Sequence, residues 1–200
     1  MNVAPVTLTH GRTRLEPLAM RHEADLATLV AEEDLWRFVS TGGLAEPGKL
    51  TVWMQNRIRE AESGDGQTWA IIDSQTERGA GCSSIFDVSA QHRHVEIGRT
   101  WLGVPYQRTA LNTEAKYLLL SYCFDTLGCV RVQLKTDARN VRSQKAIERL
   151  GAVHEGVLRA HMILPDGFIR DTVMYSITAQ EWPAVRANLE TKMATYAAEH

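Results

Sequence analysis

The segment from Val95 to Gly151 constrains the fold more than any other part of the chain. An extended run over His92–Leu102 leads through a short polar loop into a long apolar helical pattern that stops at Gly128. A second extended run, Val130–Thr136, leads into a short helix over Val141–Leu150. A loop that opens a helix directly after a strand presents free backbone N–H groups and the positive end of the helix dipole. It therefore predicts a site for a phosphate or pyrophosphate group.

The rest of the chain alternates between short strands and helices. Two extended pieces lie within Val6–Leu18 on either side of the turn-like His10-Gly11 pair. The other expected elements are an amphipathic helix over Met20–Val39, a helix over Leu50–Ala61, a hairpin of Thr68–Asp73 with Gly79–Val88, a hairpin of His154–Leu164 with Ile169–Ile177, and a last helix over about 181–198. A mixed sheet with helices on both faces accommodates this order best. We therefore expect an α/β (α+β) fold in one domain, residues 1–200.

Composition excludes several classes of protein. The chain has 200 residues, a formal net charge of −2 and 44% hydrophobic residues, which is typical of an ordinary globular domain. This balance argues against a disordered chain and against a basic nucleic-acid-binding protein. No apolar stretch is long enough to span a bilayer, and the N-terminus lacks the pattern of a secretory signal. We therefore expect a cytoplasmic protein with neither nucleic acid nor membrane as a partner.

Cysteine and histidine spacing predicts no metal site. The three cysteines, Cys82, Cys123 and Cys129, are odd in number and form no C-x-x-C pair, so they indicate neither a disulfide framework nor a zinc site. They are interpreted as small buried hydrophobic residues. The seven histidines form no metal-ligand signature, and His92 and His94 on a strand are weak evidence for one.

Five short motifs carry a resemblance that covers nearly the whole chain. They are Glu96-Ile97-Gly98, the loop from Gln107 to Asn112, Asn140 followed three residues later by Ser143, Arg149-Leu150-Gly151, and Arg170-Asp171-Thr172. In this order and at these separations they resemble the GCN5-related N-acetyltransferases (GNAT), in particular the RimJ/RimL-like branch. The resemblance implies a mixed, mostly antiparallel sheet with helices on both faces.

The resemblance also implies an activity. It is the direct transfer of an acetyl or other acyl group from acetyl-CoA, or another acyl-CoA, to a primary amine of a protein N-terminus or a small molecule. The alternative is a non-catalytic acyl-CoA-binding or sensor module of the same fold. The oligomeric state stays open, because the C-terminal helix could pack on its own domain or on a partner in a homodimer.

The loop before the long helix is the implied pyrophosphate site, although it departs from the family pattern. Gln107 matches that pattern, whereas Ala110 replaces its first glycine and Asn112 its second small residue. Alanine still presents its N–H if φ is negative. The implied cofactor-binding residues here are Gln107, Arg108, Thr109, Ala110, Leu111, Asn112 and Thr113. The alternative interpretation is a capped loop that enters a helix, with Asn112 or Thr113 as the N-cap.

Three further residues are assigned to the cofactor by the resemblance. Asn140 would hydrogen-bond the CoA arm, and the backbone N–H groups near Trp101 and Leu102 would polarise the thioester carbonyl. The alternative role for Asn140 is an N-cap of the helix that follows.

Glu96 and Ser143 are the candidate catalytic residues. Val95, Ile97 and Trp101 are expected on one face of their strand and Glu96 on the other, where Glu96 would act as general base. Its alternative role is a structural ion pair with a neighbouring arginine. In the family a tyrosine seven residues after the asparagine often serves as general acid, but Ile147 stands there.

Ser143 is the implied replacement for that tyrosine, since its hydroxyl could reach the sulfur. Its alternative role is a first-turn helix serine bonded to backbone. The tryptophans Trp36, Trp53 and Trp101 are expected to form part of the core or the wall of a pocket. The acidic run Glu32-Glu33-Asp34 is either a solvated helix end or the mouth of an acceptor pocket.

Overall fold

A single eight-stranded sheet, in the order β1-β2-β3-β4-β5-β6-β8-β7, organises the molecule. The computed structural model describes residues 1–199, with side chains to residue 195. Of the seven pairings in this part of the chain, β5 with β6 is parallel and the others are antiparallel. The predicted mixed, mostly antiparallel sheet is confirmed. The strands are β1 (Leu8–His10), β2 (Thr13–Pro17), β3 (Gly66–Asp73), β4 (Arg78–Ser89), β5 (His94–Leu102), β6 (Arg131–Asp137), β7 (Val153–Ile163) and β8 (Ile169–Thr178).

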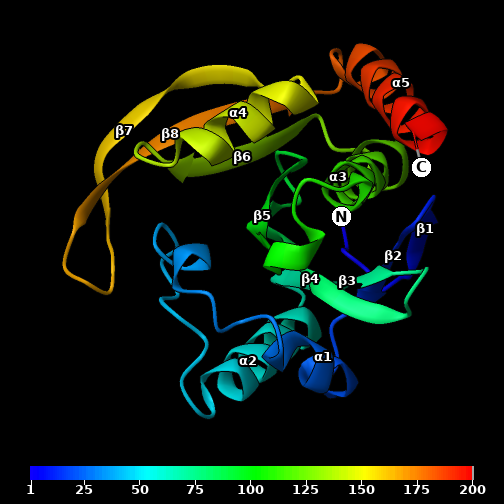
Figure 1. Ribbon diagram of the computed structural model, residues 1–200. Helices are drawn as coiled ribbons and strands as arrows, with labels where there is room; N and C mark the ends of the chain where they lie inside the picture. The colour runs from blue at the N-terminus through cyan, green and yellow to red at the C-terminus, as the bar shows by residue number, and fades with distance from the viewer. Residues whose placement is uncertain (200) are drawn as a thin grey trace.

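Helices cover both faces of the sheet, as predicted (Figure 1). They are α1 (Glu23–Ala27), α2 (Lys49–Ser63), α3 (Ala110–Ser121), α4 (Val141–Leu150) and α5 (Trp182–Glu199). One apolar core lies between the sheet and α3, α4 and α5, and a second lies between the sheet and α1 and α2. We call the side of the sheet that carries α1 and α2 the acceptor face. The bounds of α4 agree with the predicted helix, and α2 and α5 lie close to theirs.

The C-terminal helix packs on its own domain. Trp182 stacks on Phe124 with ring centroids 5.2 Å apart, and its indole nitrogen donates a 2.9 Å hydrogen bond to Asp125. Leu189, further along the apolar side of α5, is fully buried. Of the two alternatives for this helix, the structure shows the intramolecular one. None of the described helices combines the length and the apolar character needed to cross a membrane.

The first predicted helix is much shorter than expected. Met20–Val39 forms a 3-10 turn, the five-residue α1 and a second 3-10 turn instead of one helix. The apolar residues Leu26, Val30 and Trp36 are buried as the periodicity implied. However, the Trp36 indole donates to the Val30 carbonyl at 2.9 Å, which holds the chain in a folded-back loop. Burial of the apolar side chains does not require a continuous helix here.

The long helix begins earlier than expected. Its N-cap is Thr109, whose hydroxyl accepts from the Leu111 N–H, and not Asn112 or Thr113. The helix continues from Ser121 into a π-helical turn over Tyr122–Thr126.

A β-bulge in β5 interrupts the predicted alternation of side chains between the two faces of the sheet. Cys82 pairs with Trp101 and Ser84 with Gly98, so two residues of β5 oppose one residue of β4. Arg99, within the bulge, has a φ of +50°. The extra residue turns Trp101 to the face opposite Val95 and Ile97, so the expectation that all three share one face is wrong.

The parallel pairing of β5 with β6 is short. The two strands are paired from His94 to Glu96 in β5 and from Arg131 to Gln133 in β6. Beyond these residues the two strands are no longer paired. The 3-10 turn Val104–Tyr106 and then α3 follow β5, and a short loop and then α4 follow β6. We call the region between the unpaired ends of the two strands the β5/β6 opening; the segments that follow these ends lead to the N-termini of α3 and α4.

Candidate active site

Gln107 ties the end of β5 to α4 across the β5/β6 opening. Its amide nitrogen donates to the Leu102 carbonyl at 2.9 Å, and its amide oxygen accepts from the Arg142 guanidinium at 3.0 Å. Arg142 stands in the first turn of α4. The one loop residue that matches the family pattern therefore links the end of β5 to the first turn of α4.

The loop that enters α3 is compact and held by its own hydrogen bonds. Arg108 is exposed and has a φ of +61°, so an arginine makes the left-handed turn here. The Thr109 hydroxyl donates to the Tyr106 carbonyl at 2.8 Å and caps α3. Ala110 begins the helix, so its backbone is helical and its N–H has no helical acceptor. The altered loop keeps the free N–H groups that an anion needs.

Backbone groups of β5 also reach the opening. The Leu102 carbonyl accepts from Gln107, whereas the Gly103 N–H donates to Ala80 of β4. Because successive residues of a strand point their polar groups to opposite sides, the N–H of Leu102 faces the opening as well. The Trp101 carbonyl lies against Gly81, on the β4 side. Of the two residues assigned to the thioester carbonyl, Leu102 directs its backbone groups to the opening.

Asn140 caps α4 with only one end of its side chain. Its amide oxygen accepts from the Ser143 N–H at 3.0 Å, as the N-cap interpretation requires. Its amide nitrogen has no hydrogen-bond partner among the described residues. One side chain can therefore serve as a helix cap and as a donor to a ligand.

Ser143 lies in the first turn of α4 and is half-buried. Its N–H is taken by Asn140, but its hydroxyl makes no hydrogen bond within the described part of the chain. The hydroxyl is therefore available to a ligand in the opening, as is the amide nitrogen of Asn140.

Glu96 lies where β5 and β6 last pair. It is 1% exposed and faces away from Val95 and Ile97, as predicted. Its Oε2 atom accepts from Lys135 Nζ at 2.8 Å and from Gln133 Nε2 at 3.1 Å. Its structural partner is thus a lysine of β6 and not an arginine.

The other carboxylate oxygen of Glu96 is free of protein hydrogen bonds in the described residues. Gly98 leaves space beside it, because a Cβ there would lie 3.3 Å from Oε1 and 3.2 Å from the Phe86 ring. Glu96 is therefore anchored through one oxygen while the other can accept a proton.

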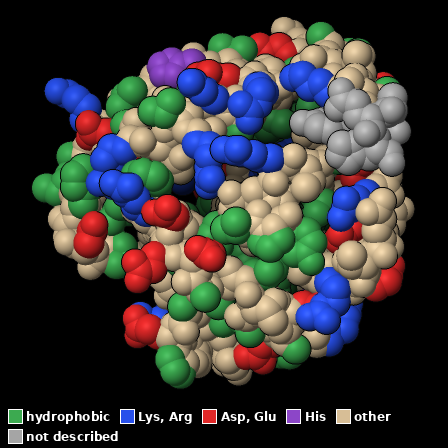
Figure 2. All heavy atoms as spheres, viewed as in Figure 1, with side chains coloured by type: hydrophobic (Ala, Val, Ile, Leu, Met, Phe, Trp, Pro, Cys, Tyr) green, Lys and Arg blue, Asp and Glu red, His purple; other side chains and the backbone are tan. Residues whose placement is uncertain are grey.

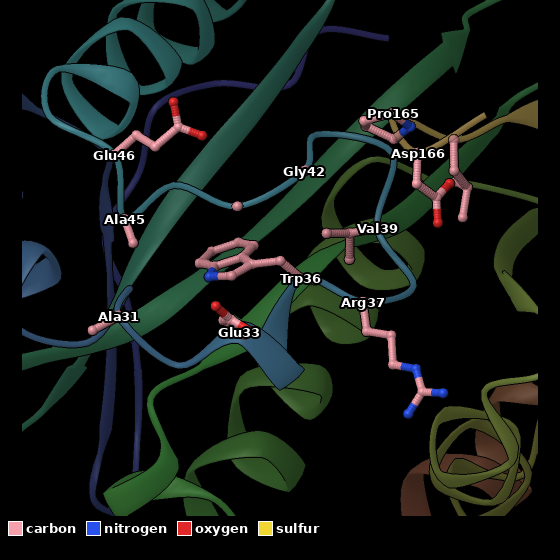
Figure 3. Close-up of a pocket in the computed structure, with 12 residues that line it drawn as sticks. Ala31, Glu33, Trp36, Arg37, Val39, Gly42, Ala45, Glu46, Pro165 and Asp166 are labelled. Carbon is pink, nitrogen blue, oxygen red and sulfur yellow. The ribbon is translucent and has the colours of Figure 1, made fainter. Parts of the chain in front are cut away.

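Aromatic side chains and a cavity also lie on the acceptor face, although Glu96 is not one of the residues that line the cavity. Trp101 packs against Trp36 and Trp53 with ring centroids 5.4 and 6.3 Å away. Trp36 and Glu33 line a cavity of about 400 Å³ that reaches the β7–β8 hairpin at Pro165 and Asp166. In Figure 3 Trp36 lies in the middle, with Ala45 and Glu46 on one side and Val39, Pro165 and Asp166 on the other. The tryptophans are pocket wall and core, within the predicted alternatives, and Glu33 is at the pocket.

The acceptor face also carries charged residues that sequence reasoning overlooked. Arg99 donates to both carboxylate oxygens of Glu60 and stacks on Phe86, with the guanidinium carbon 3.8 Å from the ring centroid. Arg139 donates to Asp137 and stacks on Phe168 at 3.5 Å. Figure 2 shows Lys and Arg side chains gathered over the upper part of the view, where Figure 1 places α4 and β6. The alternation of polar residues along β6 (Gln133, Lys135, Asp137) is a sequence signal that could have placed them on the same side of the sheet as Glu96.

A buried lysine lies on the other face, behind the bulge. Lys116 of α3 is 6% exposed and donates to the hydroxyls of Ser83 at 3.2 Å and Thr100 at 2.5 Å. Burial lowers the pKa of Lys116 to about 7, because no carboxylate offsets the loss of water around the ammonium.

Potential metal ligands do not gather in the described part of the chain. Among the described side chains, residues 1–195, no three histidine, cysteine or acidic groups converge on one point. All three cysteines are buried and unpaired with one another, as interpreted from the sequence.

Comparison with known proteins agrees with this geometry. Residues 12–153 match the model of the Acetyltransferase (GNAT) domain. YdaF of Bacillus subtilis (strain 168), a proposed ribosomal N-acetyltransferase, is 29% identical over 102 residues, which are 51% of this chain and 55% of YdaF. The chain is thus aligned with little more than half the length of this relative.

Solved structures extend the likeness to nearly the whole chain. A proposed acetyltransferase from T. thermophilus is 38% identical, with a TM-score of 0.87 over 96% of this chain and 99% of the other. Mycobacterium smegmatis RimJ in complex with CoA-disulfide shares the fold at 22% identity, with a TM-score of 0.81 over 94% and 95%. The chain belongs to the GNAT acetyltransferase family.

Proposed function

We propose that this protein is an acyl-CoA-dependent N-acyltransferase that transfers an acetyl group from acetyl-CoA directly to a primary amine. One observation carries the proposal: the pairing of β5 with β6 ends beside Glu96, and the segments that follow the β5/β6 opening lead to the N-termini of α3 and α4. Free N–H groups at helix starts bind phosphates, and exposed strand groups bind an extended amide chain. The protein would belong to the RimJ/RimL-like branch and act in the cytoplasm, with neither nucleic acid nor a membrane as partner.

The residues around the opening fit acyl-CoA. Among residues 108–113, the N–H groups that the Thr109 cap leaves free would hold the pyrophosphate, and exposed Arg108 would add positive charge. The backbone of Leu102 and the amide nitrogen of Asn140 would hydrogen-bond the pantetheine arm. Acetyl-CoA supplies the activated thioester. In support, the fold neighbour from M. smegmatis was solved with a CoA derivative.

Glu96 would act as the general base. The attacking amine must lose a proton to form the N–C bond, and the free Oε1 of Glu96 can accept it directly or through one water molecule. Lys135 and Gln133 hold Oε2, so the carboxylate keeps its orientation while the proton is transferred.

Ser143 would assist the leaving group. As the C–S bond breaks, the departing thiolate needs a proton or a hydrogen bond. The Ser143 hydroxyl is free to provide one, at the start of a helix whose dipole also favours negative charge.

The second candidate function is a module that binds acyl-CoA without turnover. The replacement of family residues by Ala110, Asn112 and Ile147 favours it. The free oxygen of buried Glu96 favours catalysis, because a buried carboxylate with an unused oxygen would otherwise only cost stability. The amine acceptor is either a protein N-terminus or a small molecule. The protein is either a monomer or a homodimer.

Thermal unfolding with and without acetyl-CoA tests the cofactor site. Ligand at roughly 100 times its dissociation constant adds about 2.7 kcal/mol of stability. For a chain of this size the expected rise in Tm is roughly 5–10 °C. Acetyl-CoA and free CoA should both produce it, and ATP should not. No rise with either CoA compound at millimolar concentration would contradict the proposal.

A further inference from the structure

Arg170 is a buried guanidinium without a partner on the acceptor face. It lies on β8, two residues from Thr172, and is 6% exposed. The alternate residues Val173 and Tyr175 point into the core on the other side, so Arg170 faces the same side as Glu96. Its Nε atom is fully enclosed and makes no hydrogen bond. Among the side chains that the structure describes, which end at residue 195, its guanidinium forms no ion pair either.

The two carboxylates whose charges act on Arg170, Asp137 and Glu96, are each already engaged by another cation. Asp137 accepts from Arg139 at 2.7 and 3.0 Å and from the Arg139 backbone N–H at 2.8 Å. Glu96 accepts from Lys135 at 2.8 Å. Burial lowers the pKa of Arg170, although the charges of Asp137 and Glu96 oppose this shift. Those two acids are therefore close enough to interact with Arg170 but are not bonded to it.

A second unsatisfied donor lies on the same face. The indole nitrogen of Trp101, which is 7% exposed, also has no acceptor in the described structure. Buried donors normally have acceptors, so a surplus of N–H groups predicts a ligand rich in acceptor oxygens. The flat fork of arginine N–H groups matches the two oxygens of a carboxylate.

We propose that Arg170 binds a carboxylate carried by one of the two substrates. This inference rests on the proposed acyl transfer, with Glu96 beside the reacting amine. The carboxylate has two sources: the amine acceptor, which would then be an amino acid, or the acyl group, which would then be a dicarboxylic acyl chain such as succinyl. In either case Arg170 is a specificity-determining residue and takes no part in proton transfer.

Matched substrates distinguish the two sources. In the acceptor arm, acetyl-CoA is combined with the twenty L-amino acids and, separately, with their amides, which lack only the carboxylate. In the acyl arm, succinyl-CoA and butyryl-CoA, which differ only at the terminal group, are compared with one amino-acid amide as acceptor. The expected result is a kcat/KM about tenfold or more higher for the carboxylate-bearing member in one arm.

Variants of Arg170 test whether this residue causes the preference for the carboxylate-bearing substrate. Arg170→Met should abolish the preference while the neutral member of the pair retains its kcat/KM within about twofold, and Arg170→Lys should keep part of it. Arg131→Met, which removes a cation paired with Glu155 elsewhere in the sheet, should leave the preference intact. Acetyl-CoA-dependent stabilisation, measured in each variant, reports whether it is folded and competent to bind.

The outcomes separate the two claims. No carboxylate preference in either arm for a wild-type protein that transfers acyl groups would overturn the inference and leave the proposed function standing. The same holds if the preference survives in Arg170→Met or, should that variant not fold, is undiminished in Arg170→Lys. A protein that neither binds acetyl-CoA nor releases CoA in the presence of amines would overturn the proposed function, and the Arg170 inference with it.

Discussion

Lys135 Nζ lies 2.8 Å from Oε2 of Glu96, across the two parallel strands at the point where they separate. The Glu96 side chain is almost fully enclosed, and that of Lys135 is about one-quarter exposed. This ion pair holds the proposed base at the apex of the β5/β6 opening. It also gives the buried carboxylate its only cationic partner among the ion pairs of the described residues.

Removal of Lys135 is expected to cost stability. Lys135→Met leaves the buried Glu96 carboxylate with only Gln133, and the free energy of unfolding should fall by about 2 kcal/mol. Urea unfolding at pH 7 measures this change. Lys145→Met, at an exposed position of α4, is the control and should change stability by less than about 0.5 kcal/mol. Equal effects of the two substitutions would contradict a structural role for the Glu96–Lys135 pair.

Two substitutions at Asn140 separate its cap from its free amide. Asn140→Ser keeps an oxygen that can accept from the Ser143 N–H but removes the amide donor. Asn140→Ala removes both and should lower stability by about 1 kcal/mol. Both variants should bind acetyl-CoA more weakly, by about fivefold, as measured by titration calorimetry. Unchanged affinity in Asn140→Ser would limit Asn140 to the capping role.

Ser143→Ala tests the proposed proton donor. Its hydroxyl has no structural partner in the described residues, so the change should leave Tm within about 2 °C. Turnover should fall by about tenfold or more, with a much smaller change in acetyl-CoA affinity. A loss confined to affinity would make Ser143 a cofactor contact only.

Lys116 should make stability depend on pH above neutrality. Its pKa is about 7 in the folded protein, against an ordinary 10.5. Between these values the unfolded chain binds the proton that the folded protein has released, so the Lys116 contribution to stability improves as pH rises from 7 toward 10.5. Below pH 7 its full destabilising effect is present.

Lys116→Met removes this penalty, and the Ser83 and Thr100 hydroxyls still bond each other at 2.7 Å. The gain in the free energy of unfolding of the variant over wild type should therefore be larger at pH 6 than at pH 9, by roughly 3 kcal/mol. Urea unfolding of both proteins at the two pH values measures this difference. A difference that does not vary with pH would mean that Lys116 is protonated in the folded state throughout.

The fold was predictable because local signals agreed with the tertiary structure. The β7–β8 hairpin and the Val141–Leu150 helix lie where turn residues and periodicity placed them. The α1 region failed because its buried residues are held by a loop, through the Trp36–Val30 hydrogen bond, and periodicity does not distinguish that loop from a helix. The bulge at Arg99 was not predictable, since no glycine or proline marks that residue's left-handed backbone.

Part of the candidate site was visible in the sequence. Alternation along the strand placed Glu96 away from the core, and the strand–loop–helix pattern placed Gln107 and Asn140 at helix starts. Lys135 was missed because a partner on a neighbouring strand depends on register, which sequence alone leaves open. Arg170 was noticed only as part of a motif, because its burial without a partner is a property of the folded molecule.

Amine-dependent release of CoA by wild type and Glu96→Gln tests the central claim most directly. Glutamine keeps the shape of Glu96 but cannot accept the proton, so kcat should fall by about 100-fold while acetyl-CoA affinity is unchanged. Glu155→Gln, which disrupts an ion pair with Arg131 on the same sheet, is the control and should retain wild-type kcat. Unchanged turnover in Glu96→Gln would contradict the assignment of the base, and no amine-dependent CoA release by wild type would contradict the enzyme itself.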